Sequence, residues 1–191
     1  MEAAENKNPL IRRHLISTEV YQQMIEIGVL SESDRVELIH GEIIDMSPVN
    51  SQHVTAVNLI NRFFTSNFNE NTLVSIQNPI MLGDYSQPEP DIALLKLKSD
   101  FYQNQIPGAD DILLVMEVAN SSLAYDQTIK ASLYATAGIL YYWIINLNDR
   151  CLELYEQPKQ QQYSVRRLYY PGETVPCPPL NAEIAVNELF V

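Results

Sequence analysis

Apolar residues along the chain fall into short blocks whose spacing switches between that of helices and that of strands. The first block, residues 17–28 (STEVYQQMIEIG), predicts a short helix that is capped by Ser17 or Thr18. The next, residues 35–47 (RVELIHGEIIDMS), alternates between apolar and polar positions on both sides of His40-Gly41, which is typical of a hairpin. The chain therefore begins with a helix followed by a pair of short strands.

Helical and strand-like blocks then alternate. A helix is predicted from Ser51 or Gln52 to Phe68, with one apolar face made of Val54, Val57, Ile60 and Phe64. Residues 126–138 (DQTIKASLYATAG) predict another helix, with Gly138 placed to end it, and residues 98–111 are polar and loop-like. Strands are predicted at residues 72–82, 90–96, 113–119, 140–147 and 151–157, and one more hairpin over residues 162–175. This order predicts an α/β (α+β) fold in which helices flank a central mixed sheet.

Length and charge narrow the class of protein. The 191 residues are enough for one domain, which we place at residues 31–191, preceded by an arm and helix at residues 1–30. No apolar run approaches the roughly 20 residues of a membrane helix, the polar N-terminus does not resemble a signal peptide, and Cys151 and Cys177 lack metal-type spacing. We therefore expect a soluble, reduced, cytoplasmic protein. The net charge of −12 argues against a large basic surface for nucleic acid, but not against a small cleft that reaches phosphate through a bound cation.

Two carboxylates stand where apolar strands would not be expected to hold them. Asp91 follows Pro90 at the mouth of PEPDIALLK, and Glu117 lies inside LLVMEVANSS, between residues whose side chains point to the other face. An unpaired carboxylate on a buried strand costs several kcal/mol unless it is paired or binds a cation. If the two strands are neighbours, a divalent metal between the carboxylates would relieve their repulsion, and oxygen ligands favour Mg²⁺ or Mn²⁺ over zinc.

A lysine follows on the next predicted helix. A metal site that retains water suits phosphodiester hydrolysis, and a nearby lysine would hold the attacking water and offset the developing negative charge. Lys130 is the candidate, with Asp126 four residues earlier on the same helical face. Taken alone, this pair is better explained by a solvated surface ion pair.

The combination of these motifs resembles a known family. Pro90-Asp91, an acid in an apolar strand and then a lysine resemble the PD-(D/E)XK nuclease pattern, although Ala119 stands where the common form has its lysine. The wider layout is similar to the Uma2 family (DUF820) of restriction-endonuclease-like proteins, abundant in cyanobacteria. The resemblance spans roughly residues 37–146 and rests on VELIHGEIIDMSP, His53, PEPDIALL, LLVMEVANSS and DQTIKASLYATAGILYYWIIN.

The resemblance implies a restriction-endonuclease-like core, an activity and a set of roles. The activity would be Mg²⁺- or Mn²⁺-dependent endonucleolytic cleavage of DNA. Asp91, Glu117 and the backbone carbonyl of Val118 would bind the metal, and Lys130, moved to the helix, would be the catalytic lysine. Glu37 would supply a further acid, and Glu42, His53 and Asp126 form a second tier of candidates. The residues themselves favour a bland interpretation of two of these positions: His53 as a residue that only begins a helix, and Tyr134 as a core aromatic rather than a base-stacking platform.

A second hypothesis is a nuclease fold that has lost catalysis and acts as a protein-interaction or regulatory module. The acidity of the chain favours it. The two hypotheses predict different positions for the basic side chains: a nuclease should gather them around the carboxylates, and a module should scatter them. The residues concerned are Arg12, Arg13, Arg62, Lys96, Lys98, Arg166 and Arg167. For the nuclease we also expect a homodimer, because cutting two strands favours two sites.

Overall fold

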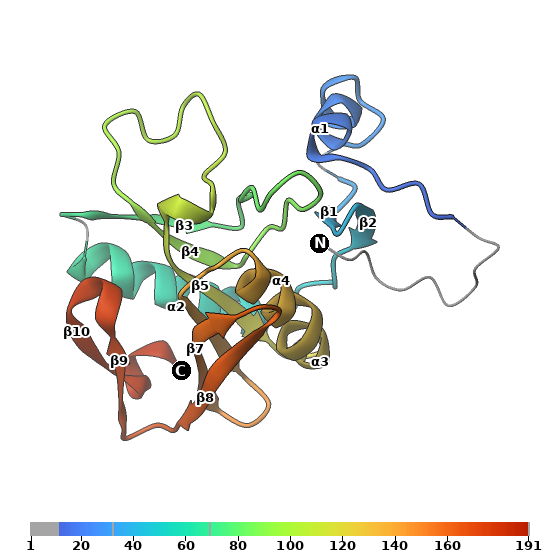
Figure 1. Ribbon diagram of the computed structural model, residues 1–191. Helices are drawn as coiled ribbons and strands as arrows, with labels where there is room; N and C mark the ends of the chain where they lie inside the picture. Colours follow the sequence, from blue (N-terminus) through green and yellow to red (C-terminus); the bar gives the residue numbers. More distant parts are fainter. Residues whose placement is uncertain (1–11, 32, 69, 191) are drawn as a thin grey trace.

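A six-stranded mixed sheet forms the centre of the molecule in the computed structural model, which describes residues 12–31, 33–68 and 70–190 (Figure 1). The strand order is β3-β4-β5-β6-β7-β8, and all neighbours are antiparallel except the parallel pair β5–β6. The predicted mixed sheet is thus confirmed. The strands are β3 (Thr72–Ile76), β4 (Ile92–Lys96), β5 (Ile112–Ala119), β6 (Tyr141–Asn146), β7 (Cys151–Lys159) and β8 (Gln162–Tyr169).

Helices cover both faces of this sheet. One face packs against α2 (Ser51–Asn67) and the C-terminal segment, and the other against the crossover between β5 and β6. That crossover consists of α3 (Leu123–Tyr125), a π-helical turn η2 (Asp126–Lys130) and α4 (Ala131–Thr136). The C-terminal segment contains β9 (Thr174–Cys177), η3 (Pro178–Leu180), β10 (Ala182–Ala185) and η4 (Val186–Leu189), and a short η1 (Ala109–Asp111) precedes β5.

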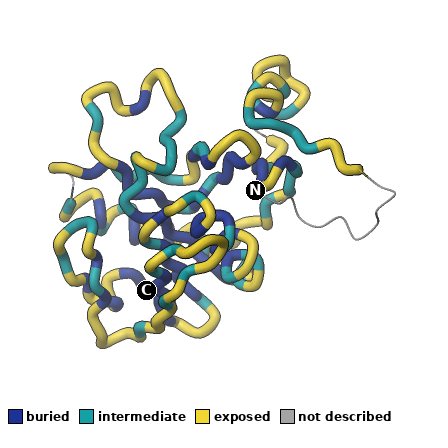
Figure 2. The backbone as a smooth tube through the Cα atoms, in the orientation of Figure 1, coloured by how far each residue is buried: buried dark blue, intermediate teal, exposed yellow. Residues whose placement is uncertain are grey.

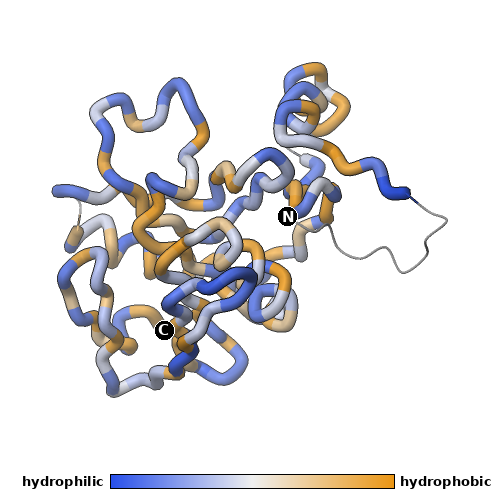
Figure 3. The backbone as a smooth tube through the Cα atoms, in the orientation of Figure 1, coloured by the Kyte–Doolittle hydropathy of each residue, from blue (hydrophilic) through white to orange (hydrophobic). Residues whose placement is uncertain are grey.

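Strand β5 separates two apolar clusters. Met116 and Val118 pack on the α2 side, while Val115 and Ala119 pack on the crossover side. Buried and apolar positions coincide along the central strands (Figures 2 and 3). Because side chains alternate along a strand, Glu117 shares the crossover face with Val115 and Ala119, and its place there is as the sequence predicted.

A hairpin and the first helix lie to one side of the sheet (Figure 1). The hairpin pairs β1 (Val36–Ile39) with β2 (Glu42–Asp45), and α1 (Thr18–Glu26) is capped by the Ser17 side chain, so both predictions are confirmed. The Tyr21 hydroxyl donates to the Val36 carbonyl at 3.0 Å. Helix α1 is therefore attached to the hairpin, whereas residues 1–11 of the predicted arm lie outside the described residues.

Four details differ from the sequence predictions. The strand expected at residues 72–82 ends at Ile76, as β3. Val54 is 45% exposed, and Ala56 replaces it on the buried face of α2. The helix expected at residues 126–138 begins at Leu123 and contains the π-turn, although Gly138 does end it with a φ of +78°. The hairpin expected over residues 162–175 is wrong, because β8 pairs with β7 and β9 pairs with β10.

Within residues 12–31, 33–68 and 70–190, none of the helices has the length and apolar character required to cross a membrane.

Candidate active site

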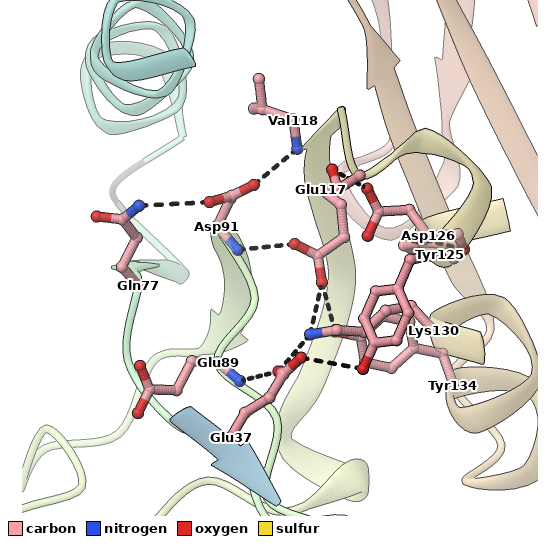
Figure 4. Close-up of polar contacts among 12 residues, drawn as sticks. Glu37, Gln77, Glu89, Asp91, Glu117, Val118, Tyr125, Asp126, Lys130 and Tyr134 are labelled. Atoms are coloured by element: carbon pink, nitrogen blue, oxygen red, sulfur yellow. Dashed lines mark hydrogen bonds and ion pairs between the residues drawn. The ribbon is translucent and has the colours of Figure 1, made fainter. Parts of the chain in front are cut away.

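Asp91 and Glu117 meet where β4 begins beside β5. Ile92 pairs with Met116, which brings the residue before β4 level with the end of β5. The Asp91 amide donates to Glu117 Oε2 at 3.1 Å, and the Val118 amide donates to Asp91 Oδ2 at 2.9 Å (Figure 4). The two strands therefore fix the two carboxylates against each other through backbone hydrogen bonds, the adjacency that the sequence analysis required.

Two side chains contact Asp91 on its other side. His53 Nε2 lies 3.0 Å from Asp91 Oδ2, and Gln77 Nε2 donates to Oδ1 at 3.3 Å. His53 comes from the first turn of α2, where its own amide donates to the cap residue Asn50. His53 Nδ1 is buried and finds no partner within the part of the chain that the structure describes. One imidazole nitrogen therefore orients Asp91 while the other is left unsatisfied.

Glu117 is buried and receives two further contacts from the crossover. The Tyr134 hydroxyl donates to Oε1 at 2.7 Å, and Lys130 Nζ lies 3.4 Å from the same oxygen. Burial raises the pKa of Glu117 to about 8; Lys130 lowers it and the Asp91 charge raises it. This carboxyl therefore holds a proton near neutral pH unless an added cation stabilises its charge.

Lys130 reaches the site from the π-turn and pairs with Glu37. Its Nζ lies 2.5 Å from Glu37 Oε2, and Glu37 also accepts from the Glu89 amide at 3.2 Å and from the Tyr125 hydroxyl at 3.3 Å. Burial lowers the pKa of Lys130, but the charges of Glu117 and Glu37 outweigh this and raise it overall. Lys130 is therefore a buried and permanently charged ammonium.

Negative charge exceeds positive charge in this cluster. Glu37, Asp91 and Glu117 are three carboxyl groups facing the single ammonium of Lys130 (Figure 4). Asp126 lies close by, accepts from the Ser122 hydroxyl at 2.7 Å, and has a pKa that burial raises to about 6. A divalent cation would correct the imbalance, and the oxygen donors present suit Mg²⁺ or Mn²⁺.

The side chains alone do not form a complete metal cage. Across the described ranges, no group of three or more His, Cys, Asp or Glu side chains is arranged to hold a metal ion. Two carboxylates and a backbone oxygen still fit Mg²⁺, which usually retains several waters. The Ala119 carbonyl accepts from Leu147 on the β6 side; because successive carbonyls alternate along a strand, that of Val118 points to the side where Asp91 lies.

The sequence and the fold are both similar to those of proteins described as nucleases. The model of the Uma2 family, described as "Putative restriction endonuclease", matches residues 18–187. The chain belongs to the Uma2 family. Its fold is similar to a crystal structure described as a "putative nuclease belonging to DUF820" from Anabaena variabilis ATCC 29413, with a TM-score of 0.65 and 15% sequence identity over 92% of this chain and 97% of that chain. A search of curated proteins found no match.

The Uma2 match contains the whole carboxylate–lysine cluster, and the structure brings most of the predicted residues together. Glu37, His53 and Asp126 all contact or adjoin the core set. Glu42 does not: it is exposed on β2 and pairs with Arg13 at 2.6 Å. The surface interpretation of Lys130 is wrong, since its side chain is 5% exposed.

Sequence reasoning missed four partners of the cluster. These are Gln77, Glu89, Tyr125 and Tyr134. Tyr134 carried a usable signal, because it lies four residues after Lys130 and so on the same face of the helix. Gln77 and Glu89 reach the site from the segment between β3 and β4, and Tyr125 reaches it from α3 of the crossover; nothing in their local sequence marks them.

The basic side chains of this Uma2 chain are spread over several elements. Four of those singled out from the sequence pair with local acids: Arg13 with Glu42, Lys98 with Asp111, Arg166 with Glu153 and Arg167 with Glu156. Lys96 ends β4, at the opposite end of the strand from Asp91. Among the described residues this is the distribution expected of an interaction module, because these four basic side chains are taken up by local ion pairs rather than gathered around the carboxylates.

Proposed function

We propose that this Uma2 chain is a metal-dependent endonuclease that hydrolyses phosphodiester bonds in DNA. The observation that carries the proposal is the reciprocal pairing of Asp91 and Glu117 at the strand ends, with Lys130 3.4 Å from Glu117. Buried carboxylates that repel each other and raise a pKa are characteristic of functional sites, because a purely structural core would avoid them.

Asp91, Glu117 and the Val118 carbonyl would hold Mg²⁺ or Mn²⁺. When bound, the metal would polarise a phosphoryl oxygen and lower the pKa of a water molecule. The protein contributes the position of the ligands: Tyr134 and the Asp91 amide orient Glu117, while His53 and Gln77 orient Asp91. Binding requires Glu117 to lose its proton, so metal affinity depends on pH.

Lys130 would act on the substrate rather than on the metal. An ammonium has three N–H donors, and the structure directs Lys130 to Glu37 and Glu117. A remaining donor can hold the attacking water or a phosphate oxygen and offset negative charge in the transition state. Glu37 fixes the lysine in this position and keeps it charged.

An interaction module is the second candidate, and the scattered basic residues favour it. Such a protein would retain the fold without turning over DNA, and its carboxylates would be a remnant. Binding of a divalent metal at Asp91 and Glu117 would not by itself decide between the two candidates. Metal-dependent cleavage that disappears with Lys130 would decide in favour of the nuclease.

The test combines calorimetry with a plasmid-nicking assay. We expect Mg²⁺ and Mn²⁺ to bind the wild type, and Asp91→Ala and Glu117→Ala to lose both binding and nicking. Lys130→Ala should bind metal but not nick. A wild type that binds no metal and does not nick would support the interaction module. We further propose that two copies pair, to be measured by light scattering of the full chain.

A further inference from the structure

A pocket of about 340 Å³ opens beside the candidate active site, at the start of α2. Its walls are the first turns of α2, the loop between β6 and β7, and the C-terminal segment; the residues are Ser51, Gln52, Thr55, Ala56, Leu147, Arg150 and Phe190. The volume lies at the lower end of the range for small-ligand pockets, about 300–1,000 Å³. A pocket of this volume can hold one small chemical group, such as a single base, but not a double helix.

The pocket is connected to the carboxylate site through the first turn of α2 and the end of β5. Gln52 lines the pocket, and the next residue, His53, contacts Asp91 at 3.0 Å. Gln52 also accepts a hydrogen bond from the Asn120 side chain at 3.4 Å, and Asn120 follows β5 two residues after Val118. A substrate whose phosphodiester lies at Asp91 and Glu117 would therefore place a neighbouring nucleotide at the pocket.

The lining has the chemistry of a nucleotide site. Arg150 is the only charged side chain among the lining residues, a contrast to the net charge of −12, and its guanidinium carbon lies 6.0 Å from the centre of the Phe190 ring. Aromatic rings and guanidinium planes are the surfaces on which unpaired bases stack. The hydroxyls of Ser51 and Thr55 and the positive end of α2 can contact a phosphate.

We propose that this pocket receives one unpaired nucleotide of the nucleic-acid substrate, with its base against Phe190 and Arg150 and its phosphate toward the start of α2. The proposal rests on the proposed nuclease function and adds a substrate class to it. A base enters such a pocket only after leaving the stack, so single-stranded or frayed ends are the preferred substrates. One local contact of this kind would also allow an acidic chain with scattered basic residues to hold DNA.

The test is calorimetric titration of the metal-free full chain in EDTA with dAMP and, separately, with inorganic phosphate. We expect dAMP to bind about tenfold or more tightly than phosphate, because base stacking contributes to dAMP alone. Thr55→Trp, which fills the pocket from an exposed position, should weaken dAMP binding about tenfold or more, and so should Phe190→Ala. Thr65→Trp, on an exposed site of the same helix, should leave it unchanged.

Three results would overturn the proposal: no binding of dAMP, binding of phosphate as tight as that of dAMP, or equal dAMP affinity in Thr55→Trp and Thr65→Trp. Thr55→Trp keeps the test valid even if Phe190→Ala does not fold. Because EDTA removes divalent metal, these results report on the pocket alone. Failure of the nuclease proposal would instead appear as absent cleavage in the presence of Mg²⁺.

Discussion

Lys130 and Glu37 are 93 residues apart in the sequence and form an ion pair at 2.5 Å, with side chains only 5% and 4% exposed. The pair links the π-turn of the crossover to strand β1 of the hairpin. A buried ion pair is weak evidence for stability, because desolvation of both charges offsets their attraction. Its position next to Glu117 fits the proposed function, in which the pair would keep Lys130 charged beside the metal-binding carboxylates.

Replacing Lys130 by Met should destabilise the protein as well as abolish cleavage. Met retains most of the side-chain volume but leaves Glu37 and Glu117 buried without their cation, and breaking a buried pair in this way costs about 3–5 kcal/mol. Urea unfolding at neutral pH measures the change, with the exposed Lys159→Met as control. A loss no larger than that of Lys159→Met would mean that Lys130 is not electrostatically required.

The stability of the metal-free protein should depend on the proton that Glu117 holds. Its pKa is about 8 in the folded protein, against an ordinary value of 4.5. Between these values the folded state binds more protons than the unfolded state, so the free energy of unfolding falls as pH rises from about 4.5 to about 8. Urea denaturation in EDTA at several pH values between these limits measures this change in the free energy of unfolding. The slope should be shallower in Glu117→Gln, and an equal slope would show that other groups cause it.

Metal binding should have the opposite dependence on pH. Mg²⁺ must displace the Glu117 proton, so its affinity should rise between about pH 6 and about pH 8, by at most about tenfold per pH unit for one proton. Calorimetry in buffers of different ionisation enthalpy reports both the affinity and the proton released. Binding that is independent of pH, with no proton release, would remove Glu117 from the ligand set.

Glu153 provides a structural control for Asp91, the carboxylate that we propose binds the metal. Glu153 lies in register with Glu117 across β6, through Ile144, but is fully paired: it accepts from Gln127, Asn146, Tyr155 and Arg166. Asp91→Asn should abolish metal binding. Above about pH 8, where Glu117 is ionised, it should also stabilise the metal-free protein by about 0.5–2 kcal/mol, because repulsion with Glu117 disappears. Glu153→Gln should destabilise it by about 1–3 kcal/mol. Thermal unfolding measures the stability of both variants. A destabilised Asp91→Asn together with a stabilised Glu153→Gln would contradict this account.

The Tyr134 hydroxyl should tune Glu117 rather than hold the fold. Tyr134→Phe keeps the ring contact with Tyr142, whose centroid is 4.9 Å away, but removes the 2.7 Å hydrogen bond to Glu117. Loss of a donor raises the pKa of a carboxyl, so Mg²⁺ affinity should fall and its pH dependence should move upward. Tyr163→Phe, which removes a hydrogen bond to the Ile139 carbonyl, serves as the matched control and should leave Mg²⁺ affinity unchanged.

Periodicity predicted the sheet, its flanking helices and the pairing of Asp91 with Glu117, because these follow from local patterns: apolar strands, a proline before Asp91 and a carboxylate inside β5. It misplaced Val54, since the exposure of one residue on α2 depends on what the helix packs against. It also missed the π-turn at Asp126–Lys130, which has no signature in residue type and is seen only in the hydrogen bonding of the crossover.

The sequence predicted the charged residues of the candidate site but not the neutral ones. Asp91, Glu117 and Lys130 stand out because charge in apolar surroundings is costly. Gln77 and Tyr125 are ordinary polar residues in their own segments and gain a role only when the fold brings them to Asp91 and Glu37. The choice between Glu37 and Glu42 was likewise decided by which face of the hairpin meets the crossover.

The most direct test of the nuclease is nicking of supercoiled plasmid by the full chain with Mg²⁺, compared with Asp91→Asn and with wild type in EDTA. Asp91→Asn retains the shape and hydrogen-bonding capacity of the side chain, so any loss reports on its charge. We predict conversion to open-circular DNA by the wild type with Mg²⁺ alone. Equal nicking by Asp91→Asn, or none by the wild type with either Mg²⁺ or Mn²⁺, would contradict the assignment of these residues to a nuclease site.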